Sequence, residues 1–371
     1  MIIQNAEVFQ PNGTFIKQDL AITDDRITVS AKDSTILDGS NLVAIPGLVD
    51  IHFHGCVGYD FCDGSHEAFR AISNYQLSQG TMAICPATMT FGEEKLVSIC
   101  EQAASFSNPE GADLVGINLE GPFISSEKKG AQNGAYISNP SLQMFRHLVE
   151  ASKGLVKLVD IAPETEGAME FIQEARSSAT VSLAHTGADF DIATEAFQNG
   201  ATHVTHLYNA MQPYNHRAPG LIGAACDQEH VRVELIADGI HIHPAAIRTT
   251  FKMFGDNRIC LISDSMEATG LKDGDYSLGG QPVKVVGNLA TLSNGTIAGS
   301  ATNLYNCMKT AVLDMNIPLG SAVKCATINP AQAIGVDKDY GTLEVGKYAN
   351  VILLDKDTMT IKHLLFKGVL L

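Results

Sequence analysis

Residues 46–55 read PGLVDIHFHG, and they mark the point where the pattern of the sequence changes. Before them, residues 2–45 contain short β-like runs broken by Pro-Asn-Gly, Thr-Asp-Asp and Asp-Gly-Ser, which is typical of a small antiparallel layer. After them, apolar strand-like runs alternate with amphipathic helical segments. This alternation predicts βαβ units with parallel strands.

Eight apolar runs can be counted from this point, which is the number of parallel strands in a closed (β/α)8 barrel. Nearly every run ends on a polar or ionisable residue, and in such barrels the carboxyl ends of the strands carry the active site. The runs begin at residues 48, 81, 114, 156, 180, 201, 231 and 258.

The sequence after the eighth run indicates that the barrel is inserted into a second, smaller domain. Residues 273–300 are rich in Gly and Asn and predict a β-hairpin excursion, and two helices are expected within residues 301–315 and 319–335. The tail is again β-like. We therefore expect an α/β fold in which a TIM-like (β/α)8 barrel, residues 46–340, is inserted into a small β-sandwich domain built from residues 1–45 and 341–371.

Composition excludes several classes of partner. The 371 residues carry a net charge of −16, and the longest basic run is the pair Lys128-Lys129, so no surface for nucleic acid or an anionic membrane is expected. No apolar run reaches the roughly 18 residues of a membrane span, and we expect a cytoplasmic protein. The eight cysteines form no Cys-Xaa-Xaa-Cys pair, which favours reduced, buried thiols.

The run after residue 48 places two histidines where they can chelate a metal. Alternation along a strand puts His52 and His54 on one face, a usual geometry for divalent metals, although buried structural histidines would give the same pattern. Glu120, His185 and His206 recur at the same end of the third, fifth and sixth runs. A carboxylate between two histidine pairs can bridge two metals about 3.5–4 Å apart, the arrangement that activates a water.

Asp264 ends the eighth run and completes this candidate site. A carboxylate beside an activated water can accept its proton and pass it to a leaving amine. A turn or capping aspartate is the alternative interpretation, but the position at the rim favours catalysis. The histidines expected to be surface or packing residues are His66, His147, His203, His216, His230, His243 and His363.

Several motifs together resemble the N-acetylglucosamine-6-phosphate deacetylases of the amidohydrolase superfamily. They cover nearly the whole chain: PGLVDIHFHG, NLEGPFIS, LAHTGAD, THVTHLYNAMQPYNHRAPG, LIADGIHIHP, LISDSMEATG, GTIAGS and ATINPAQAIG. The resemblance implies a hydrolase that converts N-acetylglucosamine 6-phosphate to glucosamine 6-phosphate and acetate, by a metal-activated water with Asp264 as general base and then acid. It implies metal ligands at His52, His54, Glu120, His185 and His206.

The resemblance also implies how a phosphorylated N-acetyl amino sugar is held. The backbone at Asn209 and Ala210, with Arg217 and His241, would bind the phosphate. In this family the arginine can come from a neighbouring subunit, so a homodimer is expected. Gln132 stands where some members have a histidine, and its amide could still bond a sugar hydroxyl. Because both histidines of the first pair are present, two metals per subunit are expected.

Some alternatives stay open at this point. Histidine and carboxylate ligands suit Zn, Fe, Mn or Co, and the motifs do not separate glucosamine from galactosamine. A cyclic-amide hydrolase of the same superfamily would bridge its metals with a modified lysine on the fourth strand, where this chain has Lys157 well before the rim. A non-catalytic barrel should have lost at least one ligand, and this chain retains all of them.

Overall fold

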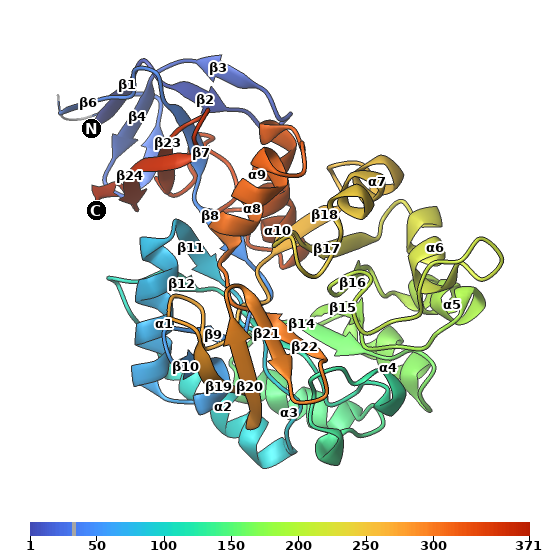
Figure 1. Cartoon of the computed structure of the whole chain (residues 1–371). Coiled ribbons are helices and arrows are strands. Elements are labelled where there is room, and N and C mark those ends of the chain that lie inside the picture. The colour runs from blue at the N-terminus through green and yellow to red at the C-terminus, as the bar shows by residue number, and fades with distance from the viewer. Residues whose placement is uncertain (32–34) are drawn as a thin grey trace.

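The computed structural model describes residues 1–31 and 35–371, which form a mixed α/β fold (Figure 1). The first and last strands are β1 Ile2–Gln4, β2 Glu7–Phe9, β3 Phe15–Lys17, β4 Leu20–Thr23, β5 Arg26–Thr28, β6 Ile36–Asp38, β7 Val43–Pro46, β23 Val351–Asp355, β24 Thr360–Phe366 and β25 Val369–Leu370. One sheet has the order β25-β24-β23-β7-β2-β3 and the other β5-β4-β1-β6. The two ends of the chain thus share one sheet.

These two sheets have a common apolar core. Ile3 and Leu20 of the four-stranded sheet belong to one buried cluster with Val8, Val351 and Leu365 of the six-stranded sheet. β7 pairs antiparallel with β23, and this contact joins the N-terminal strands to the tail. Both termini therefore lie beside these sheets, at one end of the molecule (Figure 1).

The eight apolar runs all form parallel strands, the third of them as the two short strands β12 and β13. The strands are β8 Leu48–Asp50, β11 Thr81–Ile84, β12 Asp113–Leu114, β13 Ile117–Leu119, β14 Val156–Ile161, β15 Thr180–Leu183, β16 His203–Val204, β17 Arg232–Ile236 and β18 Ile259–Ile262. The order is β12-β11-β8 in one sheet and β13-β14-β15-β16-β17-β18 in the other, with every neighbouring pair parallel. Within each of these sheets the strands lie side by side in chain order, which successive βαβ units can produce.

The strand after residue 48 is shorter than the sequence predicts. β8 ends at Asp50, so His52 and His54 follow the strand rather than lie within it. Their backbone pairs instead with the segment after β18: Asp264 N donates to His52 O at 2.9 Å, and His54 N donates to Ser265 O at 2.7 Å. The chain stays close to β18 without making a regular ladder.

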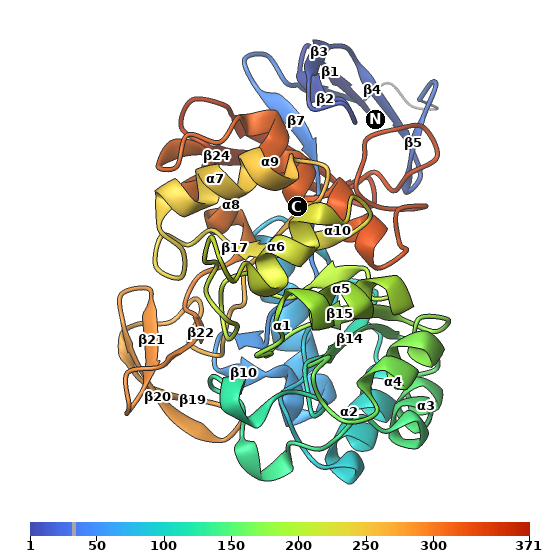
Figure 2. The same ribbon diagram turned by 90° about the vertical axis from the view of Figure 1, so that its right-hand side faces the viewer.

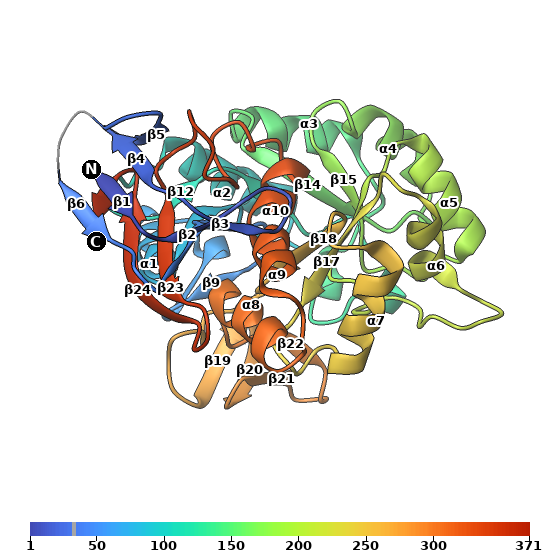
Figure 3. The same cartoon turned by 90° about the horizontal axis from the view of Figure 1, so that it is seen from above.

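Helices cover the outer side of the parallel strands (Figure 3). They are α1 His66–Ser78, α2 Glu93–Ser105, α3 Leu142–Ala151, α4 Ala168–Ala175, α5 Phe190–Asn199, α6 Gly220–Asp227, α7 Pro244–Phe254, α8 Leu304–Leu313, α9 Leu319–Ala326 and α10 Ile328–Ala333. Short polar side chains start several of them, as Ser65 does for α1 by accepting a hydrogen bond from Ala68 N. The short elements are β9 Gly55–Cys56, β10 Tyr59–Asp60, η1 Phe61–Asp63, η2 Ser126–Lys128 and η3 Gly134–Tyr136.

The second helix expected near the end of the chain, over residues 319–335, is two helices. α9 and α10 are separated at Thr327, whose backbone leaves the helical region at φ −134° and ψ −74°. A continuous helix would require an amide donor at Pro330, and its ring would clash with the carbonyl of Ala326. The proline therefore breaks the helix.

The excursion after β18 is larger than the predicted hairpin. It forms a four-stranded antiparallel sheet of β19 Gly274–Leu278, β20 Gln281–Val286, β21 Leu289–Leu292 and β22 Ile297–Ser300. Gly279 and Gly280, both with positive φ, make the tight turn between β19 and β20. In Figure 2 this sheet stands apart from the sheets of the two chain ends.

The largest buried cluster lies between the parallel strands and their helices, and includes Phe53, Phe123 and Phe171. The eight cysteines are unpaired thiols, as predicted, and seven are buried. Among the residues that the structure describes, no helix is long and apolar enough to cross a membrane.

Candidate functional site

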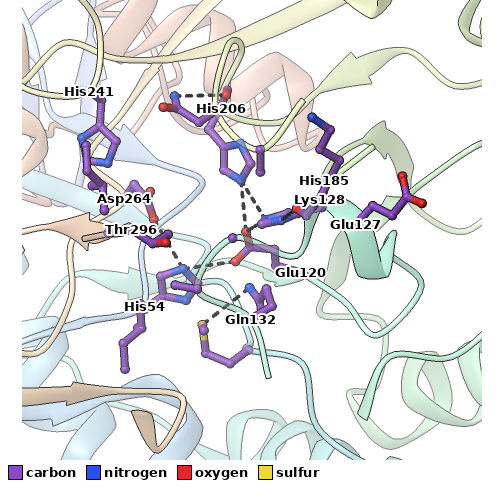
Figure 4. A pocket seen from close by; sticks show the side chains of 18 residues that line it. His54, Glu120, Glu127, Lys128, Gln132, His185, His206, His241, Asp264 and Thr296 are labelled. Atoms are coloured by element: carbon purple, nitrogen blue, oxygen red, sulfur yellow. Dashed lines mark hydrogen bonds and ion pairs between the residues drawn. The ribbon is translucent and has the colours of Figure 1, made fainter. Parts of the chain in front are cut away.

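The structure brings the six residues predicted for chemistry into one place. His52 and His54 follow β8, Glu120 follows β13, His185 follows β15, His206 follows β16 and Asp264 follows β18. All except His52 line a cavity of about 400 Å³, and His52 lies beneath them with no exposed surface. Figure 4 shows the labelled side chains of this set pointing toward one another across the cavity.

Left-handed backbone conformations direct three of these side chains. The φ angles are 44° at His185, 28° at His206 and 48° at Asp264. Non-glycine residues rarely adopt such angles, which cost on the order of 1–3 kcal/mol each and cluster at functional sites. At these three residues the backbone turns sharply after the strand, and the turn directs the side chain into the cavity.

Glu120 lies at the centre of the imidazoles. Its Oε1 is 2.8 Å from His185 Nε2 and 3.1 Å from His206 Nε2. Its Oε2 is 3.1 Å from His54 Nε2 and 3.5 Å from His52 Nε2. One carboxylate thus contacts both histidine pairs, the position expected of a bridging ligand.

Asp264 stands beside the first histidine pair. Its Oδ1 lies 3.4 Å from His54 Nε2 and 3.8 Å from His52 Nε2. Two groups of ligand atoms lie close enough together to hold a cation, His52 with Glu120 and His206, and His52 with His54 and Asp264, but both use His52. The site therefore offers at least three ligand atoms for a cation.

The side chains of the site fit a cation because unprotonated ring nitrogens face carboxylate oxygens, and neither group can donate a hydrogen bond to the other. His185 Nδ1 lies 2.9 Å from the carbonyl of Lys128, which can only accept, so Nδ1 carries the proton. In the neutral ring Nε2 is then a lone pair, yet it faces a carboxylate oxygen of Glu120. His52 Nε2 and Glu120 Oε2 are likewise buried without a hydrogen-bond partner among the described residues. A divalent metal satisfies all of these lone pairs.

The electrostatics of the buried site keep its two carboxyl groups ionised. Burial alone would raise the pKa of Glu120, but the neighbouring imidazoles of His52 and His54 hold it well below its usual range. Burial also opposes ionisation of Asp264, but the hydrogen bond with His54 and the charges of His52 and His54 together lower the pKa of Asp264. An ionised Asp264 is able to accept a proton.

Four of the five residues predicted for substrate binding line the same cavity: Gln132, Asn209, Ala210 and His241. Ala210 has φ 51°, and its amide makes no hydrogen bond to another described residue, whereas the Asn209 amide donates to His206 O. Only one of the two predicted backbone donors is therefore free for a ligand.

His241 and Gln132 are held by neighbours that sequence reasoning did not identify. His241 Nδ1 lies 2.7 Å from Asp238 Oδ2, which raises the pKa of His241 despite burial and leaves the other ring nitrogen for a ligand. Gln132 Oε1 accepts a hydrogen bond from Thr90 N at 2.7 Å. Its Nε2 donates to Met89 Sδ at 3.7 Å, which leaves one N–H and one oxygen lone pair for a sugar hydroxyl.

Arg217 lies outside the cavity of its own chain. It is exposed and belongs to the segment after β16, where Asn215 and Ala218 form a bridge. Lys128, which the sequence analysis named only as part of a basic pair, is the one lysine or arginine in the described lining. Lys157 lines a different cavity with Thr180 and Gln332, so the lysine of a cyclic-amide hydrolase is not at this site.

The excursion also supplies part of the wall, which the sequence analysis missed. Leu278 of β19 and Ile297 of β22 line the cavity, together with Met89. Gly299 must stay small, since a Cβ there would lie 2.9 Å from the carbonyl of Asp264. Leu278, Ile297 and Met89 thus give the cavity an apolar part of its wall.

Comparison with known proteins agrees with this geometry. The amidohydrolase family matches residues 43–371. An N-acetylglucosamine-6-phosphate deacetylase from Bacillus subtilis (strain 168) is 35% identical over 374 residues, covering 97% of this chain and 94% of its own length. An N-acetylgalactosamine-6-phosphate deacetylase from Escherichia coli O157:H7 is 30% identical, covering 89% of this chain and 86% of its own.

Solved structures give the same result. A mutant of N-acetyl-D-glucosamine-6-phosphate deacetylase from Mycobacterium smegmatis, in complex with N-acetyl-D-glucosamine-6-phosphate, superposes with a TM-score of 0.92. It is 30% identical, and the match covers 100% of this chain and 98% of that one. The resemblance predicted from the motifs is confirmed. The chain therefore belongs to the amidohydrolase family.

Proposed function

We propose that this protein hydrolyses the N-acetyl group of N-acetylglucosamine 6-phosphate, giving glucosamine 6-phosphate and acetate. The observation that carries the proposal is the convergence of two histidine pairs on Glu120, with an ionised Asp264 beside them in the same cavity. The curated relatives that bear this activity in their names extend over nearly the whole chain.

The fold that supports this activity is a closed (β/α)8 barrel of residues 46–340, inserted into a β-sandwich of residues 1–45 and 341–371. Two contacts support closure of the barrel between its parallel sheets. Asp264 N donates to His52 O, which joins the end of β18 to the end of β8, and a parallel bridge links Ala87 to Asn118. The pairing of β7 with β23 supports the two-part sandwich.

The cofactor is a pair of divalent cations held by His52, His54, Glu120, His185 and His206. Imidazole and carboxylate donors suit Zn, Fe, Mn or Co. When bound, such cations polarise a carbonyl oxygen and lower the pKa of a water from 15.7 towards about 7. Glu120 favours two cations over one, because its Oε2 faces His52 and His54 and its Oε1 faces His185 and His206.

The residues of the chain manage the proton and position the substrate. Asp264 takes a proton from the attacking water as the C–O bond forms, and then gives it to the amine nitrogen as the C–N bond breaks. Met89, Leu278 and Ile297 exclude water beside the acetyl methyl group. Because Asp264 and the cavity wall are already in place before the reaction, little rearrangement of solvent is needed as charge develops in the transition state.

The phosphate is bound by His241, the free amide of Ala210 and Lys128, all of which line the cavity. Arg217 is exposed and outside the cavity, and it completes the phosphate site of a neighbouring subunit in a homodimer. A guanidinium offers a rigid fork for a dianion. The cytoplasmic location expected from the sequence stays a prediction.

Acetate release from a panel of sugars tests this function. Metal-replete enzyme is expected to turn over N-acetylglucosamine 6-phosphate at least about 100-fold better, in kcat/KM, than unphosphorylated N-acetylglucosamine, since charge-assisted phosphate contacts contribute about 1.5–3 kcal/mol each. N-acetylgalactosamine 6-phosphate in the same panel separates the two sugar stereochemistries. Equal rates with and without the phosphate would contradict the phosphate site, and no release from any sugar would contradict the function.

A further inference from the structure

Glu234 is a buried carboxylate whose place in the site neither the sequence motifs nor the proposed reaction accounts for. It is the acidic residue of β17, in the run Arg232–Ile236, and its side chain has no exposed surface. Burying an ionised carboxylate costs several kcal/mol unless it is paired and hydrogen-bonded. Its contacts should therefore show what compensates that cost.

The polar contacts of the Glu234 side chain all lead to histidines at or beneath the site. Oε2 lies 3.0 Å from His52 Nδ1 and 3.0 Å from the backbone nitrogen of His206. Oε1 lies 3.2 Å from His203 Nε2. One carboxylate oxygen thus contacts a residue of the first histidine pair and a residue of the second, although these two follow different strands.

The contact with His52 decides which of its ring nitrogens carries the proton. Nδ1 also lies 3.4 Å from the side-chain nitrogen of Asn118, a donor that would favour an unprotonated Nδ1. The carboxylate of Glu234 is closer and can only accept, so the proton belongs on Nδ1. Nε2 is then a lone pair, and it is this nitrogen that lies nearest Glu120 and Asp264.

We propose that Glu234 is the positioning residue of the metal centre, a single carboxylate that fixes the ring of His52 and the backbone of His206 so that both metal-binding nitrogens face Glu120. Partners of this kind orient ligating histidines and set their tautomer. The inference rests on the proposed metal function. It goes beyond it by assigning one residue to the geometry of both histidine pairs, with His203 holding the second oxygen in place.

The competing explanation is that Glu234 supplies only negative charge to the buried site. Two conservative variants distinguish this explanation from positioning. Glu234→Gln removes the charge but keeps an oxygen that can accept from His52 and His206, with its amide turned to His203. Glu234→Asp keeps the charge, but its side chain is one methylene shorter, so the carboxylate lies farther from His52, His203 and His206. Positioning therefore predicts that Glu234→Gln retains more metal affinity than Glu234→Asp.

The experiment is a Co²⁺ titration of metal-free full-length protein, followed by visible absorption, which reports both affinity and ligand geometry. Glu234→Ala is expected to weaken Co²⁺ binding by about 10–100-fold and to change the band pattern. Glu234→Asp should behave similarly, and Glu234→Gln should retain the wild-type bands. The matched control is Asp160→Asn, since Asp160 is equally buried but contacts the hydroxyl of Thr205 rather than a candidate ligand.

Thermal unfolding of each metal-free variant identifies any that has failed to fold. If Glu234→Ala does not fold, the comparison of Glu234→Gln with Glu234→Asp tests the positioning role. Wild-type affinity and bands in Glu234→Ala would overturn the inference, and so would an affinity of Glu234→Asp above that of Glu234→Gln. Equal losses in Asp160→Asn would overturn it as well, because any buried carboxylate would then suffice. If the wild type itself takes up no Co²⁺, the metal centre fails along with the inference.

Discussion

Replacing Asp264 with asparagine is expected to abolish acetate release while leaving the metal content unchanged. The side chain stands 3.4 Å from His54 Nε2 and is ionised, so it is placed to take a proton from the attacking water. An amide of the same shape cannot accept that proton. General acid–base catalysis contributes about 10²–10⁴-fold, and kcat should fall by at least about 100-fold.

The measurement is kcat for N-acetylglucosamine 6-phosphate together with elemental analysis of the same preparation. Unchanged metal per chain and an unchanged unfolding temperature are the controls that separate loss of a base from loss of the site. Near-normal turnover in Asp264→Asn would remove the assigned role. Loss of metal would show instead that Asp264 is chiefly a ligand.

Replacing Glu120 with glutamine is expected to empty the metal centre. The two oxygens of Glu120 lie 2.8–3.5 Å from four imidazole nitrogens, and no other described carboxylate contacts ring nitrogens of both histidine pairs. Loss of an outer partner alone costs about 10–100-fold in metal affinity, so loss of this central ligand should cost more than about 100-fold. Activity should fall with the metal.

Metal per chain after dialysis and acetate release measure this effect. Glu164→Gln is the matched control, since Glu164 lies at the same rim but contacts the hydroxyl of Thr186 and the amide of Gly187. This control is expected to keep its metal. Wild-type metal content in Glu120→Gln would show that the histidines alone hold the cations and that the bridging role is wrong.

The parallel strands could be predicted because each is a continuous apolar run, buried on both faces and ended by a polar residue. Strand ends were less predictable. Alternation placed His52 and His54 within a strand, whereas β8 ends at Asp50 and the backbone then bonds to the segment after β18. Such pairing depends on residues more than 200 positions away, which no local pattern contains.

The convergence of the candidate metal ligands could be predicted because their residue types are chemically distinctive and recur at the same edge. Glu234 and His203 were missed, and His203 was expected to be a surface or packing residue, because a lone polar residue in an apolar strand reveals no partner. Both are buried, and they contact each other across β16 and β17. An acidic residue in the middle of an otherwise apolar strand was the one available signal.

The substrate side shows a different limit. His241 and Gln132 were placed at the cavity, but their orientation depends on Asp238 and on the backbone of Thr90, which only the fold reveals. Arg217 lies outside the cavity of its own chain, so the phosphate contact proposed for it would require a second subunit. The sequence thus predicts which side chains are available for the substrate better than it predicts their orientation or the subunit whose cavity they line.

The central claim is that this cavity is a metal-dependent deacetylase site, and the most direct test is acetate release from N-acetylglucosamine 6-phosphate by chelator-stripped protein as a divalent metal is added back. The account predicts negligible release without metal, and a rate that rises in proportion to bound metal until two cations per chain are bound. Full activity in protein shown by elemental analysis to contain no metal would contradict it.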